Sequence, residues 1–369
     1  AIAQGRDIIN LGIGDPDLPT LKPVVDEMGR AIRVSAYHRY PLGSGMKEFR
    51  VAAAGWFKLR FGVELDPATE VLCVIGSKEA IGHTPLALIN PGDVVLVPDP
   101  GYPVYNASTI FAGGIPYAMP LLEKNKFLPD LKAIPGKILK KAKLMFVNYP
   151  NNPTSAVADG KFYAEVVAFA KKHEIMVCSD AAYSEMYYGS EKPASFLQTP
   201  GAKDVGIEYH SHSKTFNMTG WRVGFVAGNA DMVSALASVK GNLDSGVFHA
   251  IQKAGIAAFN IKDGEIDKLR AIYRRRRDSI VPVLREIGWK VFEPQATFYI
   301  WSRIPDSFKV EKGKSVSSEF SKYLLSKAGI VATPGVGFGR YGEGYIRISI
   351  TAADERIKEA AKRLRELFG

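Results

Sequence analysis

The segment HSHSKTFNMTGWR, residues 210–222, places one lysine among hydroxyl groups and ends on an arginine. Lys214 is flanked by Ser211 and Ser213, and Arg222 follows eight residues later. A lysine amine can bond covalently to an aldehyde carbon. Hydroxyl groups and a guanidinium are common ligands of a phosphate. These residue types therefore suit a site that holds a phosphorylated aldehyde, because they supply both kinds of contact.

A carboxylate, a phenol and an amide follow two other strand-like runs. Asp180 ends the run IMVCSD, Tyr183 comes three residues later, and Asn152 lies in the turn NNPT. Pyridoxal 5'-phosphate needs such groups: a carboxylate to keep its ring nitrogen protonated, and hydrogen-bonding partners for its ring oxygen. Taken alone, Asp180 could be a helix cap and NNPT an ordinary turn. The prediction of a cofactor site therefore depends on the whole set of residues.

The phosphate and the ring of this cofactor have further candidates. Gly76 follows the run VLCVI, and Ser77 and Lys78 begin a helix whose free backbone N–H groups suit a phosphate. Tyr102, in DPGYP, offers an aromatic face that could stack on the ring. We therefore expect these four residues to share one cofactor site with the residues named above.

Short Val- and Ile-rich runs alternate with helical patterns from about residue 71, which predicts a mostly parallel sheet covered by helices on both faces. In open parallel sheets, ligands bind beyond the carboxyl ends of the strands. Five segments that carry candidate residues follow directly on such runs: 76–78, 102, 148–154, 180–183 and 211–214. We expect these segments to meet at one edge of one sheet.

The pattern changes after about residue 270. A long helix is expected over residues 263–288, followed by separated strands and a final helix with Thr351 as its cap. We predict a large cofactor-binding domain over residues 36–270 and a smaller α+β domain formed by residues 1–35 and 271–369.

The composition restricts the class of protein. A hydrophobic fraction of 46% excludes a disordered chain, and no apolar run approaches the roughly 20 residues of a membrane span. The chain has a net charge of +10, but its basic residues are interleaved with acidic ones. We therefore interpret YRRRRD at 273–278 as a solvated helix face rather than a nucleic-acid site. Cys73 and Cys178 lie in apolar runs and are expected to be buried free thiols. With no signal peptide apparent, these features favour the cytoplasm.

The motifs NNPT, SDAAYSE and SKTFNMTGWRVGF together resemble those of the class I/II aminotransferases of fold type I. The spacing agrees as well, with 28 residues from Asn152 to Asp180 and 34 from Asp180 to Lys214. The resemblance extends over nearly the whole chain. It implies a mostly parallel seven-stranded sheet between helices and a smaller α+β domain, with Lys214 bonded to pyridoxal phosphate and Arg222 on the phosphate.

The resemblance also implies roles that the composition could not indicate. Arg347, in GYIRIS, matches an arginine that binds the substrate α-carboxylate, and Gly14, in LGIGDPD, matches a glycine whose backbone contacts the same group. Tyr102 and Asn152 would border the substrate too. Tyr40, in HRYP, matches a tyrosine that reaches the phosphate of the neighbouring subunit. The resemblance therefore implies a homodimer with composite active sites.

Within the family, the stretches GIGDPDLPT, HRYP and VVLVPDPGYPVY are most similar to the LL-diaminopimelate aminotransferases. Those enzymes move an amino group from LL-diaminopimelate to 2-oxoglutarate, a step of lysine biosynthesis. The chain departs from the family pattern in three places. Ser155 stands where a glycine is usual, His212 replaces a commoner leucine, and the loop YPLGSG lacks an acidic residue. These departures concern the choice of substrate more than the cofactor.

Two other interpretations stay open at this point. A different aminotransferase specificity (aspartate, alanine or aromatic) or a C–S β-lyase needs the same lysine, so the motifs do not separate them. A non-catalytic regulatory or binding protein on this scaffold would be expected to lack Lys214, Asp180 or Arg347, and the chain has all three. We expect an aminotransferase that acts on small amino acids and 2-oxo acids, without a metal, nucleic-acid or membrane partner.

Overall fold

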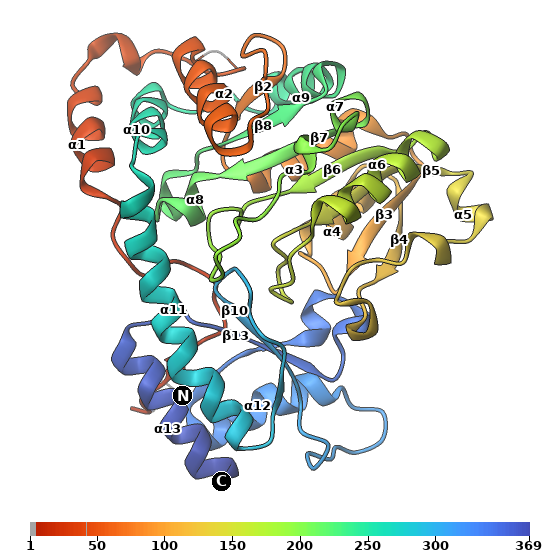
Figure 1. Ribbon diagram of the computed structural model, residues 1–369, viewed down its shortest axis with the longest axis vertical. Coiled ribbons are helices and arrows are strands. Elements are labelled where there is room, and N and C mark those ends of the chain that lie inside the picture. The colour runs from red at the N-terminus through yellow and green to blue at the C-terminus, as the bar shows by residue number, and fades with distance from the viewer. Residues whose placement is uncertain (1–4, 42) are drawn as a thin grey trace.

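The computed structural model of the chain describes residues 5–41 and 43–369, so Leu42 of the YPLGSG loop and residues 1–4 lie outside the described part. Figure 1 shows an upper part built around a large sheet and a lower part built around a smaller one. Helix α11 (Asp263–Glu286) runs from the upper part into the lower. In the described residues, no helix has the length and apolar character needed to cross a membrane.

A seven-stranded sheet forms the centre of the upper part. Its strands are β2 (Val71–Val74), β3 (Val94–Asp99), β4 (Ile115–Pro120), β5 (Ala142–Asn148), β6 (Met176–Asp180), β7 (Gly206–Ser211) and β8 (Gly224–Gly228). The strand order is β2-β8-β7-β6-β5-β3-β4, and only β8 runs antiparallel to its neighbours. Because β2 and β7 both oppose β8, they point the same way as the other four strands. The carboxyl ends of six strands therefore lie at one edge, as predicted.

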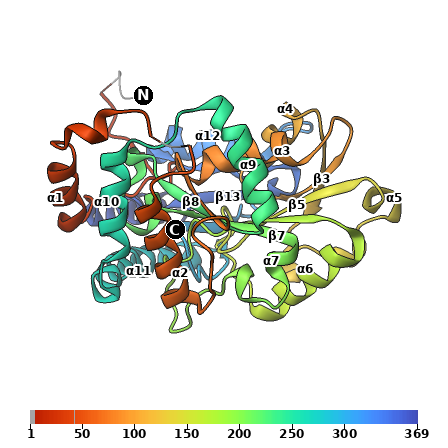
Figure 2. The ribbon, with the colours of Figure 1, turned by 90° about the horizontal axis from the view of Figure 1, so that it is seen from above.

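Helices cover both faces of this sheet, which is why its central strands are apolar on both sides. Leu96 of β3 packs into the core on one face, and its neighbour Val97 packs into the core on the other. Figure 2 shows α3, α4 and α9 on one side of the sheet and α2, α6 and α7 on the other. These helices are α2 (Lys47–Phe61), α3 (Ser77–Leu88), α4 (Val104–Phe111), α6 (Gly160–His173), α7 (Ala202–Val205) and α9 (Ala230–Leu243). The predicted fold class is confirmed.

The lower part contains a four-stranded antiparallel sheet with the order β12-β13-β10-β9. A separate parallel pair, β1 with β11, attaches the N-terminal segment to this part of the chain. The strands are β1 (Ile9–Asn10), β9 (Lys290–Val291), β10 (Tyr299–Arg303), β11 (Ile330–Val331), β12 (Thr333–Pro334) and β13 (Tyr345–Ser349). The remaining helices are α1 (Lys22–Ala31), α5 (Gly136–Leu139), α8 (His212–Thr215), α10 (His249–Phe259), α12 (Val316–Ala328) and α13 (Asp354–Phe368). The domain limits near residues 35 and 270 stay a prediction.

Two expectations about the C-terminal third were wrong. Helix α13 has Ala353 at its N-cap, and Thr351 instead donates its hydroxyl hydrogen to the carbonyl oxygen of Ile13 at 2.8 Å. The run YRRRRD is not a uniformly solvated face, because Arg276 is buried and donates to both carboxylate oxygens of Asp17 at 2.6 and 2.9 Å. Both side chains hold the N-terminal segment against the lower part.

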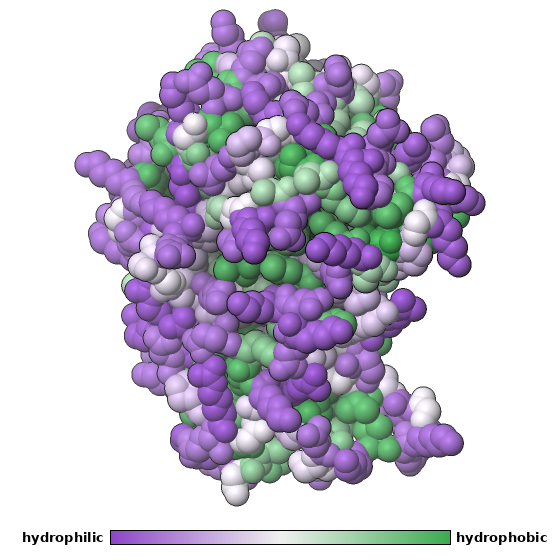
Figure 3. Space-filling model, turned by 45° about the vertical axis from the view of Figure 1, so that its right-hand side comes forward, coloured by the Kyte–Doolittle hydropathy of each residue, from purple (hydrophilic) through white to green (hydrophobic). Residues whose placement is uncertain are grey.

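Hydrophilic residues cover most of the surface in Figure 3, with hydrophobic residues in smaller patches between them. The molecule is notched at one side of this view, between its upper and lower parts. Both cysteines are buried free thiols, as expected from the sequence.

Candidate active site

Lys214 lies on α8, which follows directly on β7. Ser211 caps this short helix, since its hydroxyl oxygen accepts the backbone N–H of Ser213 at 3.2 Å. The Nζ atom of Lys214 donates to the carbonyl oxygen of Gly14 at 2.8 Å. Two predicted site residues that are 200 positions apart in the chain therefore meet in the folded protein.

The surroundings of Lys214 favour an uncharged amine. Burial lowers the pKa of Lys214 to about 8; the carboxylate of Asp15 opposes this shift, and the positive charges of Arg222 and Arg347 add to it. The neutral amine is the form that attacks a carbonyl carbon and accepts a proton. The environment therefore prepares Lys214 for covalent chemistry.

Asp180 stands at the carboxyl end of β6 and is buried. Its Oδ2 atom accepts the hydroxyl of Tyr105 at 2.6 Å, and its Oδ1 atom accepts the backbone N–H of Ala182 at 3.2 Å. Burial raises the pKa of Asp180, whereas these two hydrogen bonds favour the ionised carboxylate. Asp180 is thus held in place by two hydrogen bonds at the carboxyl end of its strand.

Gly76 and Arg222 come together at the start of α3. Gly76 is the N-cap of this helix and has a φ of 75°, a left-handed conformation that favours glycine. A Cβ atom at Gly76 would lie 2.6 Å from Nη2 of Arg222, so a larger residue would force the guanidinium to move. Ser77 and Lys78 form the first turn. Free N–H groups and a guanidinium at one helix end make a favourable place for a phosphate.

Arg347, on β13, lies in a second cluster. Its Nη1 atom donates to Oδ1 of Asn152 at 2.9 Å, and its Nη2 atom donates to the carbonyl oxygen of Gly12 at 2.6 Å. The guanidinium carbon lies 4.1 Å from the ring centre of Tyr299 and 4.7 Å from that of Phe338. Its Nε atom is buried without a hydrogen-bond partner in the described residues. The arginine is oriented by its neighbours and has a donor left for a ligand.

The two clusters are joined through tyrosines. The hydroxyl groups of Tyr183 and Tyr299 are 2.8 Å apart and hydrogen-bonded. The Tyr299 hydroxyl packs so closely on Gly14 that a Cβ atom there would lie 2.0 Å from it. The rings of Tyr102 and Tyr105 pack edge to face, with their centres 5.8 Å apart. Burial raises the pKa of Tyr102 to about 12. The aromatic residues therefore border both the Lys214 side and the Arg347 side.

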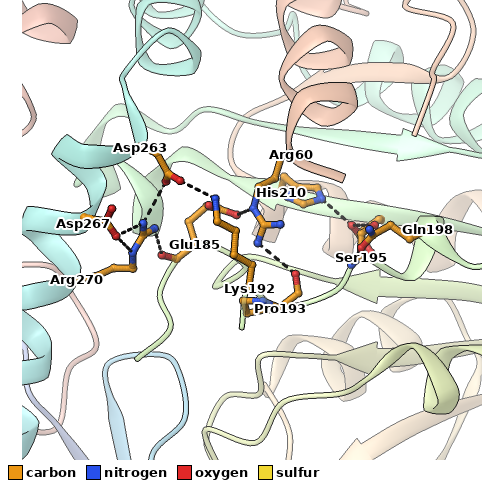
Figure 4. A network of polar contacts seen from close by, with 11 residues as sticks. Arg60, Glu185, Lys192, Pro193, Ser195, Gln198, His210, Asp263, Asp267 and Arg270 are labelled. Atoms are coloured by element: carbon orange, nitrogen blue, oxygen red, sulfur yellow. Dashed lines mark hydrogen bonds and ion pairs between the residues drawn. The ribbon is translucent and has the colours of Figure 1, made fainter. Parts of the chain in front are cut away.

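One nearly buried ion pair and one hydrogen bond to the backbone fix the segment that carries Tyr183. Glu185 accepts a hydrogen bond from Nε of Arg60 at 2.8 Å, and its carbonyl oxygen accepts one from Nη1 of Arg270 at 3.2 Å. Figure 4 shows these contacts joining helices α2 and α11 to the segment after β6, with Asp263 and Lys192 extending the network. The position of Tyr183 therefore depends on helices on both sides of its loop.

All the predicted residues except Tyr40 lie around this edge of the sheet. Tyr40 is 88% exposed and lies on the surface, as expected for a residue directed at a second subunit. Sequence reasoning missed Tyr105, Tyr299 and Phe338. Tyr105 follows Tyr102 at helical spacing and could have been inferred, but the positions of Tyr299 and Phe338 depend on how the two parts of the molecule pack.

These groups meet the needs of pyridoxal phosphate. The site offers an amine of lowered pKa, a carboxylate at a strand end, a phenol, and a helix start beside a guanidinium. The cradle at Gly76, which a Cβ atom would fill, agrees with a phosphate bound at that point. Arg347 adds a separate place for a carboxylate.

Comparison with known proteins gives one consistent result. The family described as aminotransferase class I and II matches residues 6–364. The LL-diaminopimelate aminotransferase of Aquifex aeolicus is 52% identical over 99% of this chain and 93% of its own. The enzyme of the same name from Gloeobacter violaceus is 55% identical over 99% and 92%.

Solved structures agree. The substrate-bound BacF structure from Bacillus subtilis has a TM-score of 0.94 at 40% identity and covers 100% of this chain and 93% of its own. A probable N-succinyldiaminopimelate aminotransferase from Thermus thermophilus has a TM-score of 0.92 at 34% identity, covering 99% and 96%. With these matches over its whole length, and with the amine, carboxylate and arginine in place, the chain belongs to the class I and II aminotransferases.

Proposed function

We propose that this aminotransferase uses pyridoxal 5'-phosphate to move an amino group from LL-diaminopimelate to 2-oxoglutarate, in a ping-pong reaction that serves lysine biosynthesis. The choice of substrates is supported by the names of relatives that are 52% and 55% identical over 99% of the chain. The choice of cofactor is supported by the family and by the arrangement of Lys214 and Asp180.

Bound pyridoxal phosphate supplies a ring that draws electrons away from the substrate α-carbon. Lys214 would hold the cofactor through its amine, and with that amine free it would move a proton away from the substrate α-carbon. The lowered pKa of Lys214, about 8, leaves a useful fraction of the amine uncharged for this task.

With the cofactor bound, Asp180 would keep the ring nitrogen protonated, and Tyr183 and Asn152 would hydrogen-bond the ring oxygen. Burial raises the pKa of Asp180, so an ionised carboxylate there needs a cation beside it, which the protonated ring nitrogen supplies. Tyr105 fixes the carboxylate of Asp180 through its hydrogen bond, and Tyr102 would stack on the cofactor ring.

The phosphate is held at the start of α3, where backbone N–H groups and a guanidinium meet. The residues that we assign to it are Gly76, Ser77, Lys78, Ser211, Ser213 and Arg222. Arg347 binds the substrate α-carboxylate in a bidentate manner, and the backbone of Gly14 contacts the same group. The stacked rings of Tyr299 and Phe338 keep the guanidinium plane fixed before the substrate arrives.

We also infer a homodimer with composite sites. Tyr40 is 88% exposed, and Ile32 and Val34 nearby are 46% and 42% exposed. A second subunit would cover these apolar side chains and receive Tyr40 on its phosphate. The two buried free thiols suit a reducing compartment, so we place the enzyme in the cytoplasm.

The observation that carries the proposal is the contact of Lys214 Nζ with Gly14 at 2.8 Å, because it brings the amine to the substrate side of the site. The test is a half-reaction screen. Amino acids are added one at a time to the holoenzyme, and the absorbance of the bound cofactor is followed as it converts to the amine form. LL-diaminopimelate should give the fastest conversion, and 2-oxoglutarate should reverse it with formation of glutamate.

Lys214→Ala is the control and should lack the absorbance of the lysine-bound cofactor. Fast conversion by aspartate, alanine or an aromatic amino acid, with none by LL-diaminopimelate, would contradict the substrate choice. Release of pyruvate and ammonia from cystathionine at a higher rate would instead indicate a C–S β-lyase. A protein that takes up no pyridoxal phosphate would overturn the whole proposal.

A further inference from the structure

Tyr299 touches the cofactor-side cluster and the substrate-side cluster at once. It begins β10 and is buried. Its hydroxyl is hydrogen-bonded to that of Tyr183 at 2.8 Å, while its ring lies 4.1 Å from the guanidinium carbon of Arg347. One side chain therefore contacts a residue assigned to the cofactor and the residue assigned to the substrate carboxylate.

The backbone of Tyr299 is fixed by Ser155, one of the three departures from the family pattern. Ser155 has a φ of 63°, which a glycine would adopt more readily. Its hydroxyl donates to the carbonyl oxygen of Tyr299 at 2.6 Å and is hydrogen-bonded to Oγ1 of Thr297 at 2.8 Å. Thr297 Oγ1 also accepts the N–H of Tyr299 at 3.1 Å. The serine ties the turn that carries Asn152 to the start of β10.

The hydroxyl of Tyr299 is confined on its other side by Gly14. Any side chain at position 14 would collide with it, since a Cβ atom would lie 2.0 Å away. Ser155, Gly14 and Arg347 thus enclose Tyr299 from three segments of the chain. A buried aromatic ring confined in this way stays in one orientation, and it restricts the orientations of the groups that it contacts.

We propose, on the basis of the proposed function, that Tyr299 is a positioning residue that strengthens the hydrogen bond from Tyr183 to the cofactor and orients Arg347 for the substrate carboxylate. When Tyr183 donates to the ring oxygen, its own oxygen is left to accept the hydroxyl hydrogen of Tyr299. A hydroxyl that accepts a hydrogen bond becomes a stronger donor. The two tyrosines therefore act as a chain ending on the cofactor.

A spectroscopic pH titration of the holoenzyme separates this role from a structural one. The nitrogen that joins Lys214 to the cofactor loses its proton with a change in absorbance, and a negative ring oxygen holds that proton. Tyr183 weakens this hold by donating to the oxygen. The other charged groups are Asp15, Arg222 and Arg347 around Lys214, and Asp180 and Arg347 around Tyr183.

Tyr299→Phe should shift the pH midpoint upward by about 0.5–1 unit, the effect of one hydrogen bond. Because the ring stays beneath Arg347, the KM for the amino donor should change little. Tyr183→Phe should shift the midpoint in the same direction, and the double variant should shift it no further than Tyr183→Phe alone. Tyr299→Leu removes the ring as well and should raise the donor KM by roughly tenfold.

Tyr188→Phe is the matched control, because it removes a buried hydroxyl that donates to the carbonyl oxygen of Thr297 rather than to Tyr183 or Arg347. Its midpoint should equal that of the wild type. An unchanged midpoint in Tyr299→Phe, or shifts that add in the double variant, would overturn the role of Tyr299 while the wild-type spectrum still showed a bound cofactor. Failure of the proposed function would instead appear as a wild type with no such spectrum.

Discussion

Lys214 is partly buried and Asp180 is buried, and burial shifts their pKa values in opposite directions. It lowers the pKa of the amine to about 8 and raises that of the carboxyl group, so each residue is driven toward its uncharged form. The uncharged amine can attack a carbonyl carbon without a charged partner. The carboxyl group stays ionised only beside a cation. Lys214 and Asp180 therefore suit a cofactor ring whose nitrogen carries a proton.

The lowered pKa of Lys214 predicts how the apoprotein takes up its cofactor. Only the neutral amine attacks an aldehyde, so the rate of uptake should rise with pH and level off above about 8, well below the value of 10.5 for an ordinary lysine. Stopped-flow absorbance across this pH range measures the rate. A rate that keeps rising toward pH 10 would show that the amine is not perturbed. Lys214→Ala should show no lysine-linked band at any pH.

At the scale of the elements, the loop that carries Tyr183 is held by the ion pair between Arg60 and Glu185. Both side chains are nearly buried, at 10% and 6% exposure, so the charges gain little from water. Removing one partner leaves the other charge buried and unpaired.

Glu185→Gln should therefore lower the free energy of unfolding by roughly 3 kcal/mol. Urea denaturation of the holoenzyme measures this value. The double variant Arg60→Met/Glu185→Leu should lose less stability than the sum of the losses in Arg60→Met and Glu185→Leu. The exposed pair of Lys22 and Asp26 is the control: Asp26→Asn should change stability by less than about 1 kcal/mol. Equal losses in Glu185→Gln and Asp26→Asn would contradict the assignment.

The sequence was enough to predict the edge of the sheet where the site lies. Parallel strands bring their carboxyl ends together whatever their order, so Gly76, Tyr102, Asp180 and Lys214 had to converge once the strands were recognised. Arg347 was added by the resemblance of GYIRIS to the family motif.

The contacts between the two parts of the molecule could not be predicted in this way. Tyr299 reaches Tyr183 across 116 positions, and nothing local in TFYIW indicates this contact. The burial of Arg276 was open to inference, because on a helix it shares a face with Tyr273 and Ile280, three and four residues away. The many charged residues of YRRRRD obscured this helical spacing of buried positions.

At the scale of the whole molecule, a composite dimer can be tested by mixing two impaired variants. If Tyr40 serves the partner subunit, a dimer of one Lys214→Ala chain and one Tyr40→Ala chain has one doubly altered site and one intact site. After free subunit exchange, half of the dimers are mixed, so activity should return to about a quarter of the wild-type value. No recovery in a sample shown to contain mixed dimers would place Tyr40 and Lys214 in the same chain's site.

The carbonyl groups of residues 11–13 receive hydrogen bonds from residues late in the chain. Leu11 is bonded by the N–H of Ser349, Gly12 by Thr333 and Arg347, and Ile13 by Thr351. During translation, the N-terminal segment leaves the ribosome more than three hundred residues before these donors exist. The amino-terminal wall of the site is consequently among the last parts to fold. A nascent chain interrupted before Thr333 would contain Lys214 but would lack the donors that hold this wall in place.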